Sequence, residues 1–172
     1  MRTIGIHTRV ASFATAVALL IQMSPAVAAG QDQDHNSRPV EITFTKWGAP
    51  PPAFPPTPFF GLFEGFAGDG LLGSFNAEVL WRQASVNGHV AGLEAMYEVV
   101  DGDRSFTALI RGGSNAAGLG LLDGVILAGW RTGARVHVVF QRYLPSEGGC
   151  VGAPVDKNCF EGIIYVGRAP RD

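Results

Sequence analysis

The chain has 172 residues, of which 47% are hydrophobic and 16% are charged, so it is long enough for one domain with a substantial apolar core. Its formal net charge is −2; beyond residue 28, 11 basic residues face 15 acidic ones, which gives −4. This mild charge, without a basic stripe, excludes nucleic acid as an expected partner.

The first 28 residues have the three parts of a secretory signal. Arg2 and Arg9 make the start positive, an apolar run extends from Val10 to Met23, and Ala26-Val27-Ala28 supplies a small-residue cleavage site. The run is shorter than the roughly 20 residues of a membrane-spanning helix. We expect a cleaved signal peptide over 1–28, a secreted or periplasmic mature protein, and no membrane insertion after cleavage; an uncleaved anchor is the alternative.

The next segments lead into the expected domain, residues 40–172. Residues 29–39 are polar and predict a disordered tail. The stretch VEITFTK (40–46) alternates and is rich in β-branched residues, which predicts a strand. Six prolines within 50–58 then exclude a helix and a ladder strand. We interpret 50–58 as an extended surface segment; a proline-motif ligand is the alternative.

From Gly73 onwards the pattern is one of strands and short turns. Apolar residues at every second position predict strands over 74–82, 93–99 and 105–111, with a hairpin turn at Asp101-Gly102. In the first of these strands, Trp81 is placed on the apolar face with Phe75 and Val79. In the strands 93–99 and 105–111, the face opposite the apolar one carries polar residues. They predict a solvent-exposed face with cross-strand charge pairs; a polar site is the alternative. They are Glu94, Glu98, Thr107 and Arg111.

Three further strands are predicted over 119–130, 135–143 and 159–166. The total is about seven or eight strands joined mostly by short turns, without a convincing amphipathic helix in the mature chain. An antiparallel meander of this size must cover its edge strands, and closure removes them. The expected fold class is therefore all-β, a single antiparallel up-and-down β-barrel of about eight strands.

Cys150 and Cys159 are the two cysteines of the chain. An even number of cysteines in an exported protein predicts a disulfide, here closing a loop rich in Gly, Pro, Asp and Asn. A metal pair or a redox site is the weaker interpretation, because there is no CxxC spacing and no nearby histidine.

Familiar catalytic signatures are absent from the sequence. It contains no GxSxG, HExxH or GxxxxGK motif, and its histidines are scattered. We therefore predict no metal site and no cofactor.

Candidate site residues are polar or aromatic side chains within the predicted strands. Asp123 shares a parity with leucines, and Arg142 shares one with Val136, Val138 and Phe140. If both pointed inward, they could form a charged pair in a cavity; the alternative places each at the barrel rim. With Tyr97 they are the candidate catalytic residues. The candidate ligand contacts, for which a core role is the alternative, are Trp81, Trp130, Phe106, Phe140 and His137.

Several segments resemble one protein family in strand rhythm and glycine placement. They are GDGLLGSFNAEVL (68–80), LEAMYEVVDGDRSFTALIRGG (93–113), GLLDGVILAGWRTGARVHVVFQ (120–141) and the closing CF-G-I-I. Over roughly 40–168 the chain resembles bacterial proteins with an allene oxide cyclase barrel-like domain, whose eight-stranded barrel is shared with dirigent proteins. The resemblance implies a lumen for a fatty-acid epoxide or a phenolic radical, and no catalytic residue is carried over. The Pro-rich segment and the disulfide depart from this pattern.

Three functions follow as expectations. The first is a secreted barrel that binds a small apolar ligand, lipid-like or phenolic, in its lumen. The second is an isomerase of the cyclase kind, which requires inward polar groups. The third is an interaction module with a filled barrel. Association into a homo-oligomer is compatible with each of them.

Overall fold

The computed structural model describes residues 38–53, 58–84 and 89–168. The signal peptide and most of the predicted tail lie outside these residues, as does part of the Pro-rich segment. Within them, the chain forms eight strands and three short 3₁₀ turns. The strands are β1 (Val40–Gly48), β2 (Leu62–Ala67), β3 (Gly73–Ala84), β4 (Val90–Val100), β5 (Phe106–Ser114), β6 (Leu119–Gly129), β7 (Arg135–Tyr143) and β8 (Cys159–Val166). The turns are η1 (Asp69–Leu71), η2 (Gly102–Arg104) and η3 (Pro145–Glu147).

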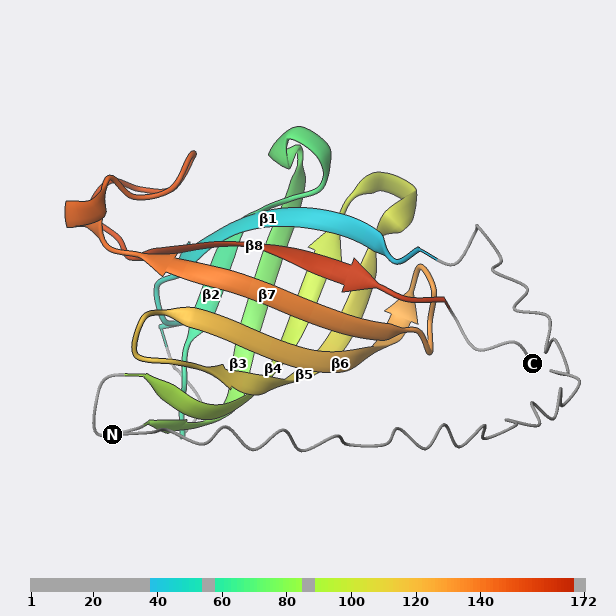
Figure 1. Ribbon diagram of the computed structural model, residues 1–172, viewed down its shortest axis with the longest axis horizontal. Helices are drawn as coiled ribbons and strands as arrows, with labels where there is room; N and C mark the ends of the chain where they lie inside the picture. The colour runs from blue at the N-terminus through green and yellow to red at the C-terminus, as the bar shows by residue number, and fades with distance from the viewer. Residues whose placement is uncertain (1–37, 54–57, 85–88, 169–172) are drawn as a thin grey trace, which may run out of the picture. The chain divides into compact units, whose positions relative to one another are not determined.

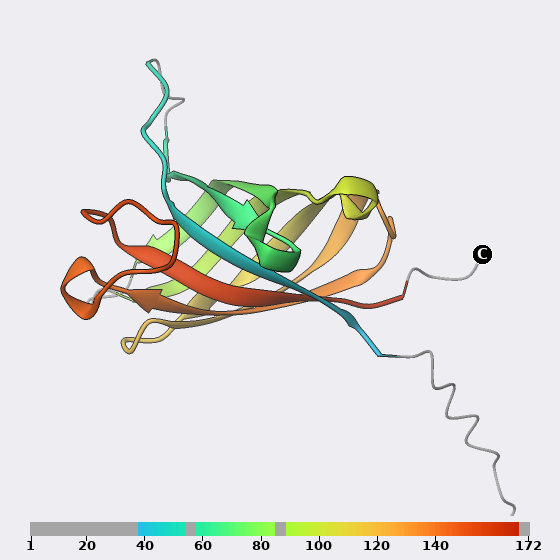
Figure 2. The ribbon, with the colours of Figure 1, turned by 90° about the horizontal axis from the view of Figure 1, so that it is seen from above.

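Each strand pairs antiparallel with its neighbours in sequence, and β1 pairs with β8 to close the barrel (Figure 1). This confirms the predicted all-β barrel. Because the strands alternate in direction, β1, β3, β5 and β7 all terminate at the same end, which we call the loop end; it lies to the left in Figure 1. We call the other end the turn end. The view from above shows the strands curving around to close the barrel (Figure 2).

Side chains fill the interior towards the turn end. Phe44 of β1 stacks on Phe75 of β3 with ring centroids 5.2 Å apart, and Tyr97 of β4 meets Phe75 edge-on at 4.8 Å. Each such aromatic pair contributes about 0.5–1.5 kcal/mol beyond the area that it buries. This half of the barrel is a packed core.

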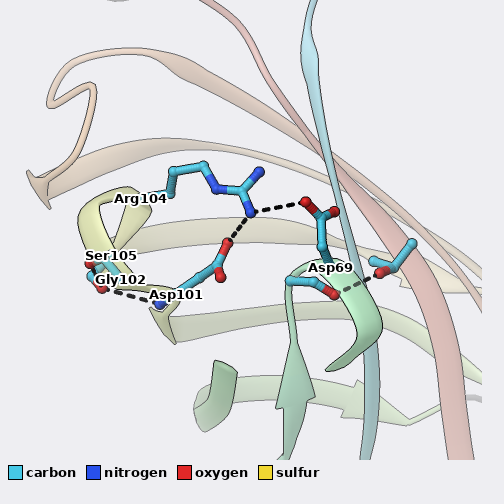
Figure 3. Close-up of polar contacts among 7 residues, drawn as sticks. Asp69, Asp101, Gly102, Arg104 and Ser105 are labelled. Atoms are coloured by element: carbon cyan, nitrogen blue, oxygen red, sulfur yellow. Dashed lines mark hydrogen bonds and ion pairs between the residues drawn. The ribbon is translucent and has the colours of Figure 1, made fainter. Parts of the chain in front are cut away.

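The β4–β5 hairpin is joined to η1 at the turn end by polar contacts. The guanidinium of Arg104 lies 2.7 Å from the Asp101 carboxylate and 3.4 Å from that of Asp69 (Figure 3). The hydroxyl of Ser105 accepts a hydrogen bond from the backbone N–H of Asp101 at 3.0 Å and donates one to the Gly102 carbonyl. The Asp69 carboxylate is exposed, so its ion pair contributes at most about 1 kcal/mol, and the half-buried Arg104–Asp101 pair orders the turn together with the Ser105 hydrogen bonds.

The segment between β7 and β8 is held against the outside of β1. The predicted disulfide between Cys150 and Cys159 is formed, and the Lys157 ammonium donates a hydrogen bond to the carbonyl of Gly48 at 3.0 Å. Trp47 points out of the barrel, yet it is only 8% exposed, because its ring packs against Phe66. A disulfide is compatible with an extracellular or periplasmic protein. Among the described residues, no helix is long and apolar enough to span a membrane.

Replacing both Cys150 and Cys159 with serine should lower the free energy of unfolding by about 2–3 kcal/mol, because the open chain regains the entropy that this short loop loses. Urea denaturation followed by circular dichroism measures the change. Adding a reductant should destabilise the original protein by a similar amount and leave the double variant unchanged. An unchanged unfolding midpoint in the variant would contradict this expectation.

Candidate functional site

A cavity opens inside the barrel towards the loop end, beyond the aromatic core. Its volume is about 80 Å³, several times the roughly 10–15 Å³ that one water molecule needs. Ala77 of β3 and Ala95 of β4 face it, and their small side chains leave the space that the aromatic rings on the opposite wall do not reach. The lining residues are Lys46, Phe60, Phe63, Ala77, Val79, Arg82, Val90, Leu93, Ala95, Tyr97, Ser114, Phe140 and Phe160.

Lys46 lies at the inner end of this cavity and is only 4% exposed. It follows Ile42 and Phe44 on the inward parity of β1, so the strand carries its amine into the lumen. Its Nζ donates a hydrogen bond to the hydroxyl of Tyr97. Six aromatic rings lie with their centroids 4.5–5.7 Å from Nζ, and they belong to Phe44, Phe63, Phe75, Tyr97, Phe140 and Phe160.

The surroundings of Lys46 act on its charge in opposite directions. The ring faces attract an ammonium ion, whereas removal from water disfavours it. Burial has the larger effect and lowers the pKa of Lys46 to about 7. Burial also raises the pKa of the Tyr97 hydroxyl, so Tyr97 stays protonated at neutral pH. Within the described residues, no carboxylate forms an ion pair with Lys46.

This arrangement is chemically versatile at neutral pH. A lysine that titrates near 7 exists partly as a neutral amine, which is a base and a nucleophile, and partly as an ammonium, which donates hydrogen bonds. Tyr97 adds a hydroxyl that can both donate and accept a hydrogen bond. An apolar cavity with two such groups at its inner end can hold an oxygen atom of a bound molecule.

Two of the sequence-predicted site residues face this cavity. Tyr97 is 2% exposed, and Phe140 is 5% exposed. The catalytic role predicted for Tyr97 and the ligand contact predicted for Phe140 remain predictions, and both side chains line the cavity.

The structure places Asp123 and His137 on the outside of the barrel, contrary to the inward position considered for Asp123. The leucines that share the Asp123 parity are exposed as well, so this is the outer face of β6. The Asp123 carboxylate lies 2.8 Å from Nδ1 of His137 on β7, and both side chains are largely in water. Neither residue lines the cavity.

Arg142 lies on the inward parity of β7, at the loop end, where it is half-buried. Its backbone N–H donates a hydrogen bond to the carbonyl of Gly118 in the β5–β6 connection. Asp123 points outward from the middle of β6, so the charged pair considered from the sequence is not formed. Arg142 therefore occupies the rim position that was the alternative.

A β-bulge reverses the predicted orientation of Trp81. Val79 pairs with Ala95, but Trp81 pairs with Glu94, so Leu80 is an extra residue in β3. From this point the parity changes: Trp81 turns outward and is 49% exposed. Arg82, which the uninterrupted alternation had placed outside, turns inward at the mouth of the cavity.

The other predicted aromatic contacts lie near the turn end. Phe106 begins β5 and is 3% exposed within the packed core. Trp130 follows β6 and packs against that core, with the Arg131 guanidinium 4.5 Å from its ring centroid. Both side chains belong to the filled half of the barrel, which agrees with the core role given as the alternative to a ligand contact.

Lys46 is the central group that the sequence interpretation missed. The signal was present, because Val40, Ile42, Phe44 and Lys46 alternate with Glu41, Thr43 and Thr45. A lysine at the end of an apolar parity is usually read as the point where a strand reaches water. Here β1 extends two residues further, to Gly48, and keeps Lys46 inside the barrel.

Comparison of the chain with protein-family models, with curated proteins and with solved structures finds no match. The resemblance to allene oxide cyclase barrel-like proteins therefore stays a prediction from the sequence.

Proposed function

We propose that this protein acts outside the cytoplasm and binds a small apolar molecule, lipid-like or phenolic and bearing an oxygen atom, in the cavity at the loop end. The observation that carries this proposal is the Lys46 amine, held with the Tyr97 hydroxyl at the inner end of an apolar cavity. The disulfide and the signal-like amino terminus support export.

A purely structural role accounts poorly for Lys46. Burying an amine costs free energy, and an apolar side chain of similar length would fill the same position without that cost. Tyr97 accepts only one of the hydrogen bonds that the amine can make. A ligand oxygen that accepts another hydrogen bond would compensate part of the cost, which favours a binding barrel over the filled interaction module.

The walls define the rest of the ligand. The rings of Phe63, Phe140 and Phe160 pack together at the wall formed by β2, β7 and β8, and Ala77 and Ala95 leave room along β3 and β4. A flat ring or a short hydrocarbon chain fits such surroundings, with its oxygen towards Nζ of Lys46. The Arg82 side chain at the mouth is exposed, so a second polar group of the ligand would meet water or a guanidinium there.

A cyclase-like isomerase is the second candidate. It is favoured by the same two inward polar groups, because ring closure of a reactive epoxide requires a shaped apolar cavity and a few hydrogen-bonding groups. The two candidates differ in the fate of the bound molecule: a binding protein releases it unchanged, whereas an isomerase releases a product of equal mass and different structure.

Replacing Leu93, which lines the cavity near its mouth, with tryptophan should weaken ligand binding at least about tenfold, equivalent to about 1.4 kcal/mol, because the larger side chain occupies the entrance. Benzyl alcohol, titrated by NMR, is a probe of suitable size and chemistry. The matched control is Leu121→Trp on the outer face of β6, where Leu121 is 51% exposed. Equal affinity of both variants for benzyl alcohol would contradict a ligand site in the lumen.

A further inference from the structure

We propose that Lys46 captures the carbonyl group of an apolar aldehyde or ketone in this cavity, forming a reversible imine. The inference rests on the proposed function and narrows the ligand to a carbonyl compound. It goes beyond binding because a covalent bond joins the ligand to the chain.

The position of the Lys46 amine favours this reaction. Nζ of Lys46 lies at the cavity, in contact with the Tyr97 hydroxyl and within 5.7 Å of six ring centroids. A carbonyl compound whose apolar part packs against these rings has its carbonyl carbon directed towards the amine. Holding two reactants in such an arrangement removes much of the entropic barrier to their reaction.

The protonation state of the Lys46 amine favours the reaction as well. Only an unprotonated amine attacks a carbonyl, and burial keeps the pKa of Lys46 near 7, so a large fraction of this amine is neutral at physiological pH. The titratable or charged groups that share the cavity are Tyr97 on β4 and Arg82 on β3. The lining residues of β2, β7 and β8 are phenylalanines, so no carboxylate from these strands holds the amine in its charged form.

The reaction balances without an oxidant or a reductant. The Nζ lone pair forms a bond to the carbonyl carbon while the π electrons move to oxygen, and a proton then passes from the nitrogen to this oxygen and gives a carbinolamine. The C–O bond then breaks, the nitrogen lone pair forms C=N, and one water molecule leaves. The Tyr97 hydroxyl, which is bonded to Nζ, can donate a proton to the departing oxygen and take the remaining Nζ proton in return, so Tyr97 is protonated again once the imine has formed. The surrounding ring faces attract the iminium cation that forms during dehydration.

The chain offers a matched control, because it contains only two lysines, Lys46 and Lys157. Lys157 lies in the disulfide-closed loop outside the barrel, where its ammonium donates to the Gly48 carbonyl. Benzaldehyde is the probe, and sodium cyanoborohydride converts any imine into a stable secondary amine. Each modification adds the mass of benzaldehyde less one oxygen atom, and peptide mapping by mass spectrometry locates it.

The expected result is preferential labelling of Lys46, at least about tenfold faster than labelling of Lys157 or of the terminal amine. Lys46→Met should lose the Lys46 adduct, whereas Lys157→Arg should keep it. The labelling rate should rise as the pH increases through about 7, where the amine loses its proton. Tyr97→Phe should still form the adduct, but several-fold more slowly.

Two outcomes separate this inference from the proposed function. If benzyl alcohol binds in the lumen and benzaldehyde labels only Lys157 or the terminal amine, the imine is excluded and the binding function stands. If benzyl alcohol does not bind and Lys46 stays unlabelled, both are overturned. Near-ultraviolet circular dichroism of Lys46→Met verifies that the loss of the adduct does not reflect a loss of the fold.

Discussion

Replacing Lys46 with methionine should raise the free energy of unfolding by roughly 2–3 kcal/mol at neutral pH. Lowering the pKa of this lysine from 10.5 to about 7 costs the folded state about 4–5 kcal/mol, at about 1.4 kcal/mol for each pH unit. Methionine avoids that cost and fills a similar volume. However, the substitution leaves the buried Tyr97 hydroxyl without its hydrogen-bond partner, which reduces the gain in stability by about 1–3 kcal/mol. The double variant Lys46→Met, Tyr97→Phe removes this penalty and should be more stable still.

The pH dependence has a definite sign. Between about 7 and 10.5 the unfolded chain binds a proton at Lys46 that the folded chain does not, so the stability of the original protein rises with pH across this window. Below pH 7 both states bind the proton and the burial cost is fully present. The stability difference between Lys46→Met and the original protein should therefore shrink as the pH rises from 7 to 10.5.

Urea denaturation with the disulfide intact, repeated across this pH range, measures the difference directly. The other titrating groups are common to both proteins and largely cancel in the comparison. A difference that stays constant with pH would show that Lys46 keeps its ordinary pKa. The amine would then be protonated at neutral pH and could not form the imine.

A stabilising substitution at Lys46 has a functional meaning. Proteins commonly carry destabilising groups where activity needs them, and replacing such groups raises stability while removing function. The expected combination here is a more stable protein that no longer forms the Lys46 adduct. A residue with a purely structural role would show the opposite relation, because its replacement would lower stability.

Much of the fold could be predicted from the alternation of apolar and polar residues. Seven of the eight strands were assigned in this way, and the polar parity of β4 and β5 faces outward, with Arg111 bonded to Glu94 as the charge-pair interpretation expected. The missing strand is β2, which is six residues long, contains Gly65 and follows the Pro-rich segment. Its pairing with β1 and β3 compensates for a weak local pattern, and such tertiary contacts are not visible in the sequence.

The site was harder to predict because a single inserted residue changes which side chains share a face. Leu80 separates Trp81 from the parity of Val79, and no turn residue marks the bulge. Lys46 was missed for a different reason. Its side chain is charged, so it was not expected inside the barrel even though it shares the inward parity of β1. The alternation identifies which residues share a face of a strand. Which side chains meet inside the barrel is decided only when β1 pairs with β8 and the barrel closes.

Replacing Gly162 with alanine should lower the free energy of unfolding by about 3 kcal/mol, the upper part of the usual range for overpacking a core. Gly162 lies on β8 between Phe44 and Phe140, and a Cβ atom there would be 2.2 Å from the carbonyl oxygen of Val139 and 2.9 Å from Cα of Phe140. The β7 backbone must move away, which weakens the β7–β8 hydrogen bonds. The matched control is Gly48→Ala, where a Cβ meets nothing within 4 Å and the change should stay within about 0.5 kcal/mol.

The same substitution should also weaken binding of benzyl alcohol, because Phe140 forms one wall of the cavity. Its ring lies directly over Gly120 of β6, where a Cβ would be only 2.0 Å from Cζ, so the ring has no room to retreat when its backbone shifts. Urea denaturation and the NMR titration of Gly162→Ala and Gly48→Ala test both effects together. A destabilised Gly162→Ala that binds benzyl alcohol with unchanged affinity would show that the Phe140 wall is not part of the ligand site.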